Sequence, residues 1–173
     1  FYVNLWSSLF TWGGKPIPTD GDFVVIPSGQ TLLLDTSTAV LSFLLIQGQL
    51  IFDDTQPFIS LKAENILITS GGLLQVGTEQ QPYMNKAEIV LYGHVLSTEL
   101  PVYGAKTLAV RDGMLELHGR PLNVTWTRLA KTANAGDTTL YLAQAVDWQV
   151  GGSVVIAATG FVQTENEDTT IAS

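Results

Sequence analysis

The stretch NILITSGGLLQV (65–76) decides the fold of this chain, because a pair of glycines stands between two short apolar runs. The same arrangement returns in four other stretches: VVIPSGQTLLL (24–34), FLLIQGQLIF (43–52), EIVLYGHVLS (88–97) and TLAVRDGMLEL (107–117). Successive glycines, counted through Gly72, lie 19, 24, 21 and 20 residues apart. A repeat of about twenty residues is the sequence signature of a solenoid.

When the five stretches are aligned on their glycines, apolar residues fall at the same offsets. Seventeen of the twenty positions that lie five or three residues before the glycine, or two or four after it, are apolar. A spacing of two places each pair on one face of a β-strand. This alignment puts Phe43 and Leu45 in the interior of the second repeat. We expect strand, glycine corner, strand and return in every repeat, with equivalent strands stacked in parallel about 4.8 Å apart.

Glycine suits such corners because it adopts positive φ, or allows close approach of another backbone segment, at little steric cost. If every corner needs this geometry, replacing Gly48 or Gly93 with valine should destabilise the fold by roughly a few kcal/mol.

The repeats predict an all-β fold: a right-handed parallel β-helix of about five coils with a β-rich C-terminal extension. Residues 1–22 would form an N-terminal cap, residues 23–120 the coils, and residues 121–173 the extension, as an excised part of a longer ectodomain. A β-sandwich is the alternative, because it also has short strands with turn signals about every 8–12 residues. The shared register of the repeats favours the solenoid.

An open solenoid end exposes unpaired strand edges and its core, so it needs a cover. At the N-terminal end Trp6, Phe10 and Trp12 are the expected apolar cover. The best helical candidate is the short piece Thr36–Ser42, with Asp35 as its N-cap. In the extension, strands are expected at Thr138–Leu142 and Ser153–Ala157, followed by a solvated loop over residues 164–170.

Composition excludes several classes of function. The formal net charge is −8 and no run of basic residues exists, which argues against nucleic acid as a partner. The chain contains no cysteine, so disulfides and thiolate metal sites are ruled out. The longest strongly apolar run, Val40–Ile46, is far too short to span a bilayer, so we expect no membrane insertion. No phosphate-binding or dinucleotide motif is present, and no cofactor is expected.

At the level of motifs, the run WGGKPIPTDGDFVVIPSGQTLLLD (12–35), together with LLIQGQLIF, ILITSGGLLQVGT, IVLYG and GMLELHG (113–119), resembles the G8 domain. The resemblance covers about residues 12–120 and is to G8 domains of the fibrocystin and fibrocystin-like ectodomain type. It extends to related G8 domains of the cell-migration-inducing hyaluronidases. The segment AGDTTLYLAQAVDWQVGGSVVIAAT (135–159) resembles the region C-terminal to G8 in the fibrocystin branch, and the missing cysteines depart from the hyaluronidase branch.

This resemblance implies an extracellular structural or interaction module of a large cell-surface or secreted protein. Its partners would be neighbouring domains of the same protein and an extracellular glycan or protein ligand. The alternative that the resemblance leaves open is a part of a hyaluronan-depolymerising ectodomain. Few aromatic residues in the repeats are free to act as sugar platforms, which favours the module.

Asp112, Glu116 and His118 are the candidate catalytic residues. Glu116 and His118 lie two apart on one predicted strand and share its outer face, with Leu115 and Leu117 towards the core. An acid beside an imidazole is suited to general acid–base cleavage of a glycan. The simpler interpretation, which we favour, is that both side chains solvate an outer face or bond the neighbouring repeat. We therefore expect no enzymatic activity.

The remaining polar signals are weaker. Five aspartates (Asp20, Asp22, Asp35, Asp53 and Asp54) suggest calcium, yet none fits a calcium-binding loop, and Asp53 is better interpreted as a turn residue. We predict no metal site; the alternative is a calcium site with oxygen ligands from separate repeats. His94 directly follows Gly93 and has no second histidine near it in the sequence. In the alignment on the glycines it lies opposite Leu73. The triplet Asn123-Val124-Thr125 is a glycosylation sequon, and in the extracellular setting that the resemblance implies, Asn123 is the predicted acceptor.

Overall fold

The computed structural model describes residues 4–94, 96–97 and 99–172, which form two compact units, Phe1–Arg120 and Pro121–Ser173. No α-helix occurs among the described residues, and the single 3-10 turn η1 covers Gln163–Glu165. Nor does any helix in this part of the chain have the length and apolar character needed to cross a membrane. The prediction of an all-β chain is therefore confirmed.

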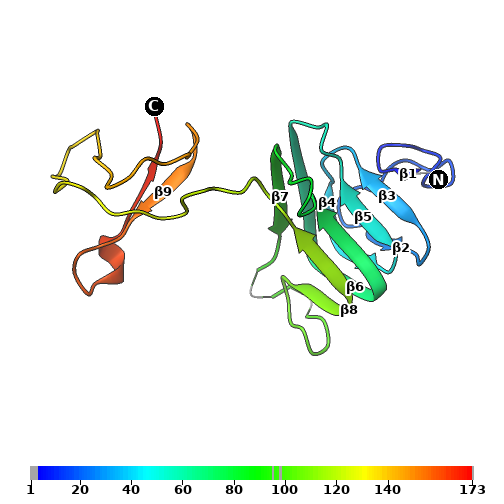
Figure 1. Ribbon diagram of the computed structural model, residues 1–173. Coiled ribbons are helices and arrows are strands. Elements are labelled where there is room, and N and C mark those ends of the chain that lie inside the picture. Colours follow the sequence, from blue (N-terminus) through cyan, green and yellow to red (C-terminus); the bar gives the residue numbers. More distant parts are fainter. Residues whose placement is uncertain (1–3, 95, 98, 173) are drawn as a thin grey trace. The chain divides into compact units, whose positions relative to one another are not determined.

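The first unit is a curled sheet of parallel strands (Figure 1). Its strands are β1 (Asn4–Leu5), β2 (Phe23–Ile26), β3 (Thr31–Leu34), β4 (Val40–Ile46), β5 (Gln49–Phe52), β6 (Phe58–Val76), β7 (Lys86–Leu91) and β8 (Leu108–Leu117). Strands before the glycines pair in the order β2–β4–β6–β8. Strands after them pair in the order β3–β5–β6–β8, and β1 of the N-terminal segment pairs with β3. Parallel stacking is thus present, but a right-handed β-helix of five coils is not confirmed.

The fourth repeat, EIVLYGHVLS (88–97), does not stack on the third. Strand β7 pairs with the beginning of β6, from Phe58↔Lys86 to Ala63↔Leu91. The glycine-containing part of β6 pairs directly with β8, as in Ile66↔Leu108. Strand β7 ends at Leu91 and β8 begins at Leu108, and Val95 of this repeat lies outside the described residues. The apolar run before Gly93 belongs to a different part of the sheet, so the twenty-residue rhythm was a misleading guide here.

The second repeat is also shifted by one residue from the expected alignment. Ile26 pairs with Ile46, and Val24 with Leu44. Phe43 therefore points outward, where its ring stacks on Phe23 with centroids 5.1 Å apart and an interplanar angle of 9°. The cause is the length of the corners: four residues separate β2 from β3, but only two separate β4 from β5.

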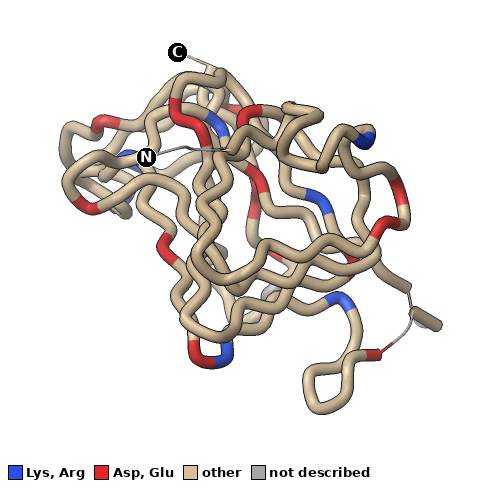
Figure 2. The backbone as a smooth tube through the Cα atoms, turned by 90° about the vertical axis from the view of Figure 1, so that its right-hand side faces the viewer, with Lys and Arg blue, Asp and Glu red and all other residues tan. Residues whose placement is uncertain are grey.

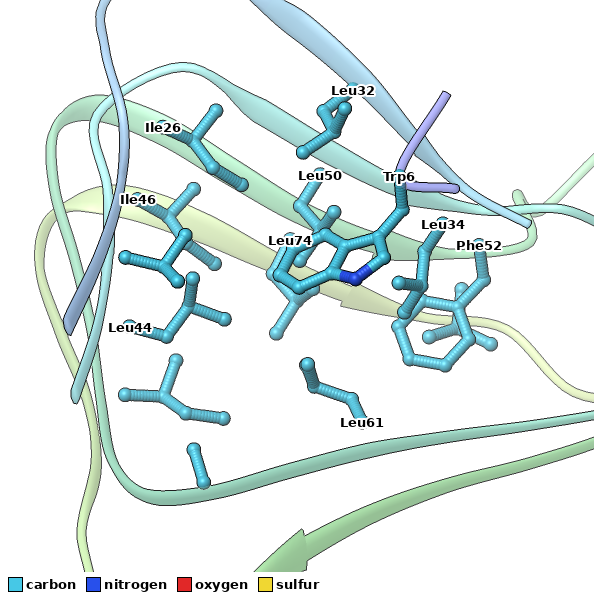
Figure 3. Packing of buried hydrophobic residues seen from close by; sticks show 14 of the residues in the cluster. Trp6, Ile26, Leu32, Leu34, Leu44, Ile46, Leu50, Phe52, Leu61 and Leu74 are labelled. Atoms are coloured by element: carbon cyan, nitrogen blue, oxygen red, sulfur yellow. The ribbon is translucent and has the colours of Figure 1, made fainter. Parts of the chain in front are cut away.

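Columns of aliphatic residues fill the inside of the curl (Figure 3). Each column takes one residue from each successive strand, and its members are almost completely buried: Ile26, Ile46 and Ile68 in one column, and Leu32, Leu50 and Leu74 in the other. Burial of such side chains is the main favourable contribution to folding, about 1.5–3 kcal/mol for each one.

Aromatic cover at the N-terminal end is only partly as predicted. The Trp6 ring lies inside the cluster, and Trp12 packs edge-on against it with centroids 5.1 Å apart. The indole Nε1 of Trp12 also donates a hydrogen bond to the Trp6 carbonyl oxygen over 2.8 Å. Phe10 was expected to join this cover, but 93% of it is exposed.

The expected helix over Thr36–Ser42 is wrong. The chain enters strand β4 at Val40, and the Asp35 carboxylate accepts hydrogen bonds from the backbone N–H and hydroxyl of Ser7 at 2.9 and 2.5 Å. Asp35 therefore ties the N-terminal segment to β3 and caps no helix. A short polar stretch between strands was mistaken for a helical turn.

The second unit contains an antiparallel pair, β9 (Ser153–Ile156) with β10 (Glu167–Thr170). Strand β9 was expected. The stretch Thr138–Leu142 forms no strand and contributes only an isolated bridge between Leu142 and Leu129. The stretch expected to be a solvated loop contains β10, which is fully exposed but paired with β9.

Candidate functional site

The outward side chains of β1, β3, β5, β6 and β8 form a continuous surface, which we call the Gln75–Glu116 face. They alternate with the buried leucines along each strand, so they point away from the core. Two aligned rows cross this face: Leu33, Ile51, Gln75 and Glu116 in one, and Thr31, Gln49, Leu73 and Met114 in the other. The face thus combines aliphatic groups with uncharged amides, and Glu116 is its charged member in these rows.

Glu116 is bonded across the sheet. Its carboxylate Oε2 accepts a hydrogen bond from Gln75 Nε2 over 2.8 Å. Among the described residues, no hydrogen bond or ion pair joins Glu116 to a second carboxylate or to an imidazole. A hydrolytic pair needs two proton-transfer groups on either side of a scissile bond, and this glutamate is instead half-buried beside an amide.

His118 follows β8 and is held by its backbone. Its N–H donates to the Val76 carbonyl over 2.8 Å, and its carbonyl accepts from the Tyr83 N–H over 2.7 Å. Both bonds continue the ladder beyond the end of the strand. These backbone contacts hold His118 beside Val76 and Tyr83.

Asp112 occupies a corner. Its φ is 55°, and Ser70 has the same value at the corresponding corner of β6, where the register slips between Thr69 and Gly72. Aspartate is among the few residues other than glycine that enter this left-handed region readily. Glu116 therefore lies near the end of β8 and His118 directly follows the strand. Asp112 lies at the preceding corner, where its positive φ turns the backbone.

The last pass of the sheet leaves inward positions uncovered. Val110 and Leu117 of β8 are 44% and 55% exposed, although their register partners on β6, Ile68 and Val76, are 0% and 8% exposed. Within the described strands, β8 pairs with β6 and with no further strand. We call this surface the open edge of β8. It is both a row of unpaired backbone groups and a strip of apolar side chains.

Asp53 serves a turn. Asp53 accepts hydrogen bonds from the Thr55 N–H at 2.9 Å, the Thr55 hydroxyl at 2.7 Å and Gln56 Nε2 at 3.3 Å, which confirms the predicted turn. Burial acts to raise the pKa of Asp53, but these hydrogen bonds outweigh it and the pKa is lowered. Nowhere in the described ranges do three or more acidic or histidine side chains gather as metal ligands would.

Charge is spread thinly over the molecule. Figure 2 shows the lysine and arginine positions separated from one another along the chain. Lys86 pairs with Glu88 at 2.9 Å, and its ammonium also lies 5.2 Å from the centre of the Phe58 ring. Phosphate backbones are bound by clustered cations, so this distribution is unsuited to nucleic acid.

A second candidate site lies within the second unit. Residues 123–128, together with Ala143 and Gln144, line an open groove of about 490 Å³. The sequon asparagine Asn123 and Trp126 are among the lining residues, and 69% of Trp126 is exposed. Sequence reasoning found Asn123 but missed the groove. The sequon was the only local signal, because the exposure of Trp126 becomes visible only in the structure.

The sequence matches a known domain family. A model of the G8 domain family matches residues 11–130, which is more than half of the chain. The chain belongs to the G8 domain family. The resemblance predicted from the glycine-containing motifs is therefore confirmed.

Among G8 relatives, human Fibrocystin-L is 61% identical over 175 residues, a match that covers 99% of this chain. Dog fibrocystin is 50% identical over 152 residues and 87% of the chain. Protein rliB of Dictyostelium discoideum is 29% identical over 180 residues. The chain spans 4% of the length of Fibrocystin-L and of fibrocystin, so it corresponds to one small part of those large proteins.

Proposed function

We propose that this chain is an extracellular structural and interaction module of a large fibrocystin-like protein, without catalytic activity of its own. Membership of the G8 family and the 4% share of the relatives' length support the module. The Glu116 carboxylate, which is engaged with the Gln75 amide, favours a structural role over glycan cleavage.

The observation that carries the proposal is the open edge of β8. Inward apolar side chains at an uncovered edge are costly in water and invite pairing with another segment. The partner we assign to this edge is a neighbouring domain of the same polypeptide, because most of the length of the relatives lies outside the matched region. A glycan or a separate protein bound there would be an alternative outcome.

Hydrogen–deuterium exchange tests the assignment. We expect the amides of β8 to exchange about tenfold more slowly in a longer segment of the same polypeptide than in this chain alone. Strand β2, at the opposite edge, should show no such change. Val110→Asp should abolish the slowing, whereas Val25→Asp on β2 should leave it intact. Equal exchange of β8 in both proteins would refute the docking of a neighbouring domain.

Hyaluronan cleavage is the competing function, and its test is direct. We expect high-molecular-weight hyaluronan to keep its size distribution after incubation with this chain, because Glu116 has no opposing acid among the residues that the structure describes. Gel analysis of the polymer is the measurement. Shortening by the wild-type chain that Glu116→Gln or His118→Ala abolishes would overturn the assignment as a non-catalytic module.

The proposed extracellular location makes Asn123 an acceptor for N-linked sugar. In that reaction C1 of the first N-acetylglucosamine of a lipid-linked diphosphate oligosaccharide bonds to Asn123 Nδ2. The C1–oxygen bond to the diphosphate breaks, and Nδ2 loses one proton. Asn123 is exposed, so an attached glycan displaces no buried contact.

A further inference from the structure

The groove of the second unit is built by two segments that hold each other. The Ala143 N–H donates to the Arg128 carbonyl over 2.8 Å, and the Ala130 N–H to the Tyr141 carbonyl over 2.7 Å. Val124, which precedes Arg128 in the first segment, is also held, because Trp148 Nε1 donates to its carbonyl over 2.5 Å. The segments that line the groove are therefore held in place by hydrogen bonds.

Asn123, which lines this groove, is held by hydrogen bonds. Its backbone N–H and its side-chain Nδ2 both donate to Asp147 Oδ2, at 2.9 and 3.1 Å. An N-linked amide nitrogen keeps one of its two hydrogens, so a sugar on Nδ2 is compatible with one donation to Asp147. The sugar would start at an atom whose side chain already lines the groove.

Trp126 supplies a surface that fits the first sugar. Tryptophan is seldom left as exposed as this one, and its electron-rich face attracts the weakly positive C–H groups of a pyranose ring. Arg128, Gln144 and Thr125 also line the groove, and their side chains carry groups of the kind that bond sugar hydroxyl and acetamido groups. A neutral, amide-bearing hexose such as N-acetylglucosamine matches both kinds of contact.

We infer that the first N-acetylglucosamine attached to Asn123 lies in this groove and stacks on Trp126. The inference rests on the glycosylation of Asn123 proposed above. A tethered sugar has an effective local concentration of about millimolar or more, so it occupies the groove in preference to dilute free saccharides. The groove thus binds the glycan that is attached to the same chain.

The test uses the full chain secreted from cells that make high-mannose glycans. Intact mass reports occupancy of Asn123, and NMR reports the acetyl methyl signal of the first sugar after trimming to a single residue. We expect this signal to shift upfield through the indole ring current, and to return to its free position in Trp126→Ala. Phe161→Ala, which removes another exposed aromatic of the same unit outside the groove, should leave the shift unchanged.

A second readout is enzymatic removal of the untrimmed glycan from the native chain. Loss of the stacking contact should expose the linkage, so an amidase that cleaves it should act about fivefold faster on Trp126→Ala than on wild type. The indole N–H signal of Trp148 confirms that each variant is folded, because it is bonded to Val124. An unoccupied Asn123 would refute both the glycosylation and the inference. An occupied Asn123 with no ring-current shift would refute the stacking alone.

Discussion

Replacing Gly48 with valine is expected to lower the free energy of unfolding by about 3 kcal/mol or more. A Cβ at this position would overlap the carbonyl oxygens of Pro27 and Gln30. Neither oxygen is free to withdraw: Pro27 accepts from the Gln30 N–H over 3.1 Å, and Gln30 accepts from the Gln49 N–H over 2.8 Å. The corner is tight because the backbone of the previous pass touches Gly48, and positive φ plays no part in it.

The matched control is Gly93→Val. A Cβ there would meet the Lys106 side chain, at 3.1 Å from its Cβ, and Lys106 is exposed. We expect a loss below about 1 kcal/mol. The sequence predicted equal losses at the two glycines, and the structure separates them because Gly93 lies in no corner of the sheet. Urea unfolding of both variants is the measurement. A large loss at Gly93, or none at Gly48, would show that the corner geometry is wrong.

Much of the fold is readable from alternation and glycine spacing. The columns through Ile68 and Leu74 follow from apolar residues spaced by two, since only one face of each strand can reach the core. The all-β class and the parallel pairing follow from the same pattern. The motifs themselves, and not their spacing, identified the family.

The errors of sequence reasoning have physical causes. Corner length varies between repeats, so an alignment on the glycine misplaced Phe43 and Leu45 by one residue, which turns a side chain to the opposite face. The repeat at Gly93 kept the rhythm but not the pairing, because β7 pairs with the beginning of β6 and no local sequence signal marks this change.

The candidate site was predicted only in part. The sharing of one face by Glu116 and its neighbours follows from strand periodicity, whereas its bond to Gln75 depends on register between residues 41 apart. The groove at Asn123 requires two segments to approach, residues 123–128 and the pair Ala143 and Gln144. No local pattern encodes such long-range contacts, so only the sequon itself could be found.

The pairing of β6 with β8 is the claim on which the fold depends, and a disulfide can test it. The natural chain has no cysteine, so two introduced cysteines can pair only with each other within one molecule. Leu73 and Met114 are direct register partners with outward side chains. Neighbouring strands are about 4.8 Å apart, a Cα separation that a disulfide spans without strain.

The measurement is the yield of intramolecular disulfide under mild oxidation, read by mass spectrometry of peptides from the folded, monomeric chain. The account predicts nearly complete formation in Leu73→Cys/Met114→Cys and almost none in Leu73→Cys/His94→Cys, the pair that the glycine alignment would place together. A disulfide between positions 73 and 94, with none between 73 and 114, would contradict the account. It would mean that residues 88–97 pair with the glycine-containing part of β6, as the alignment on the glycines predicts.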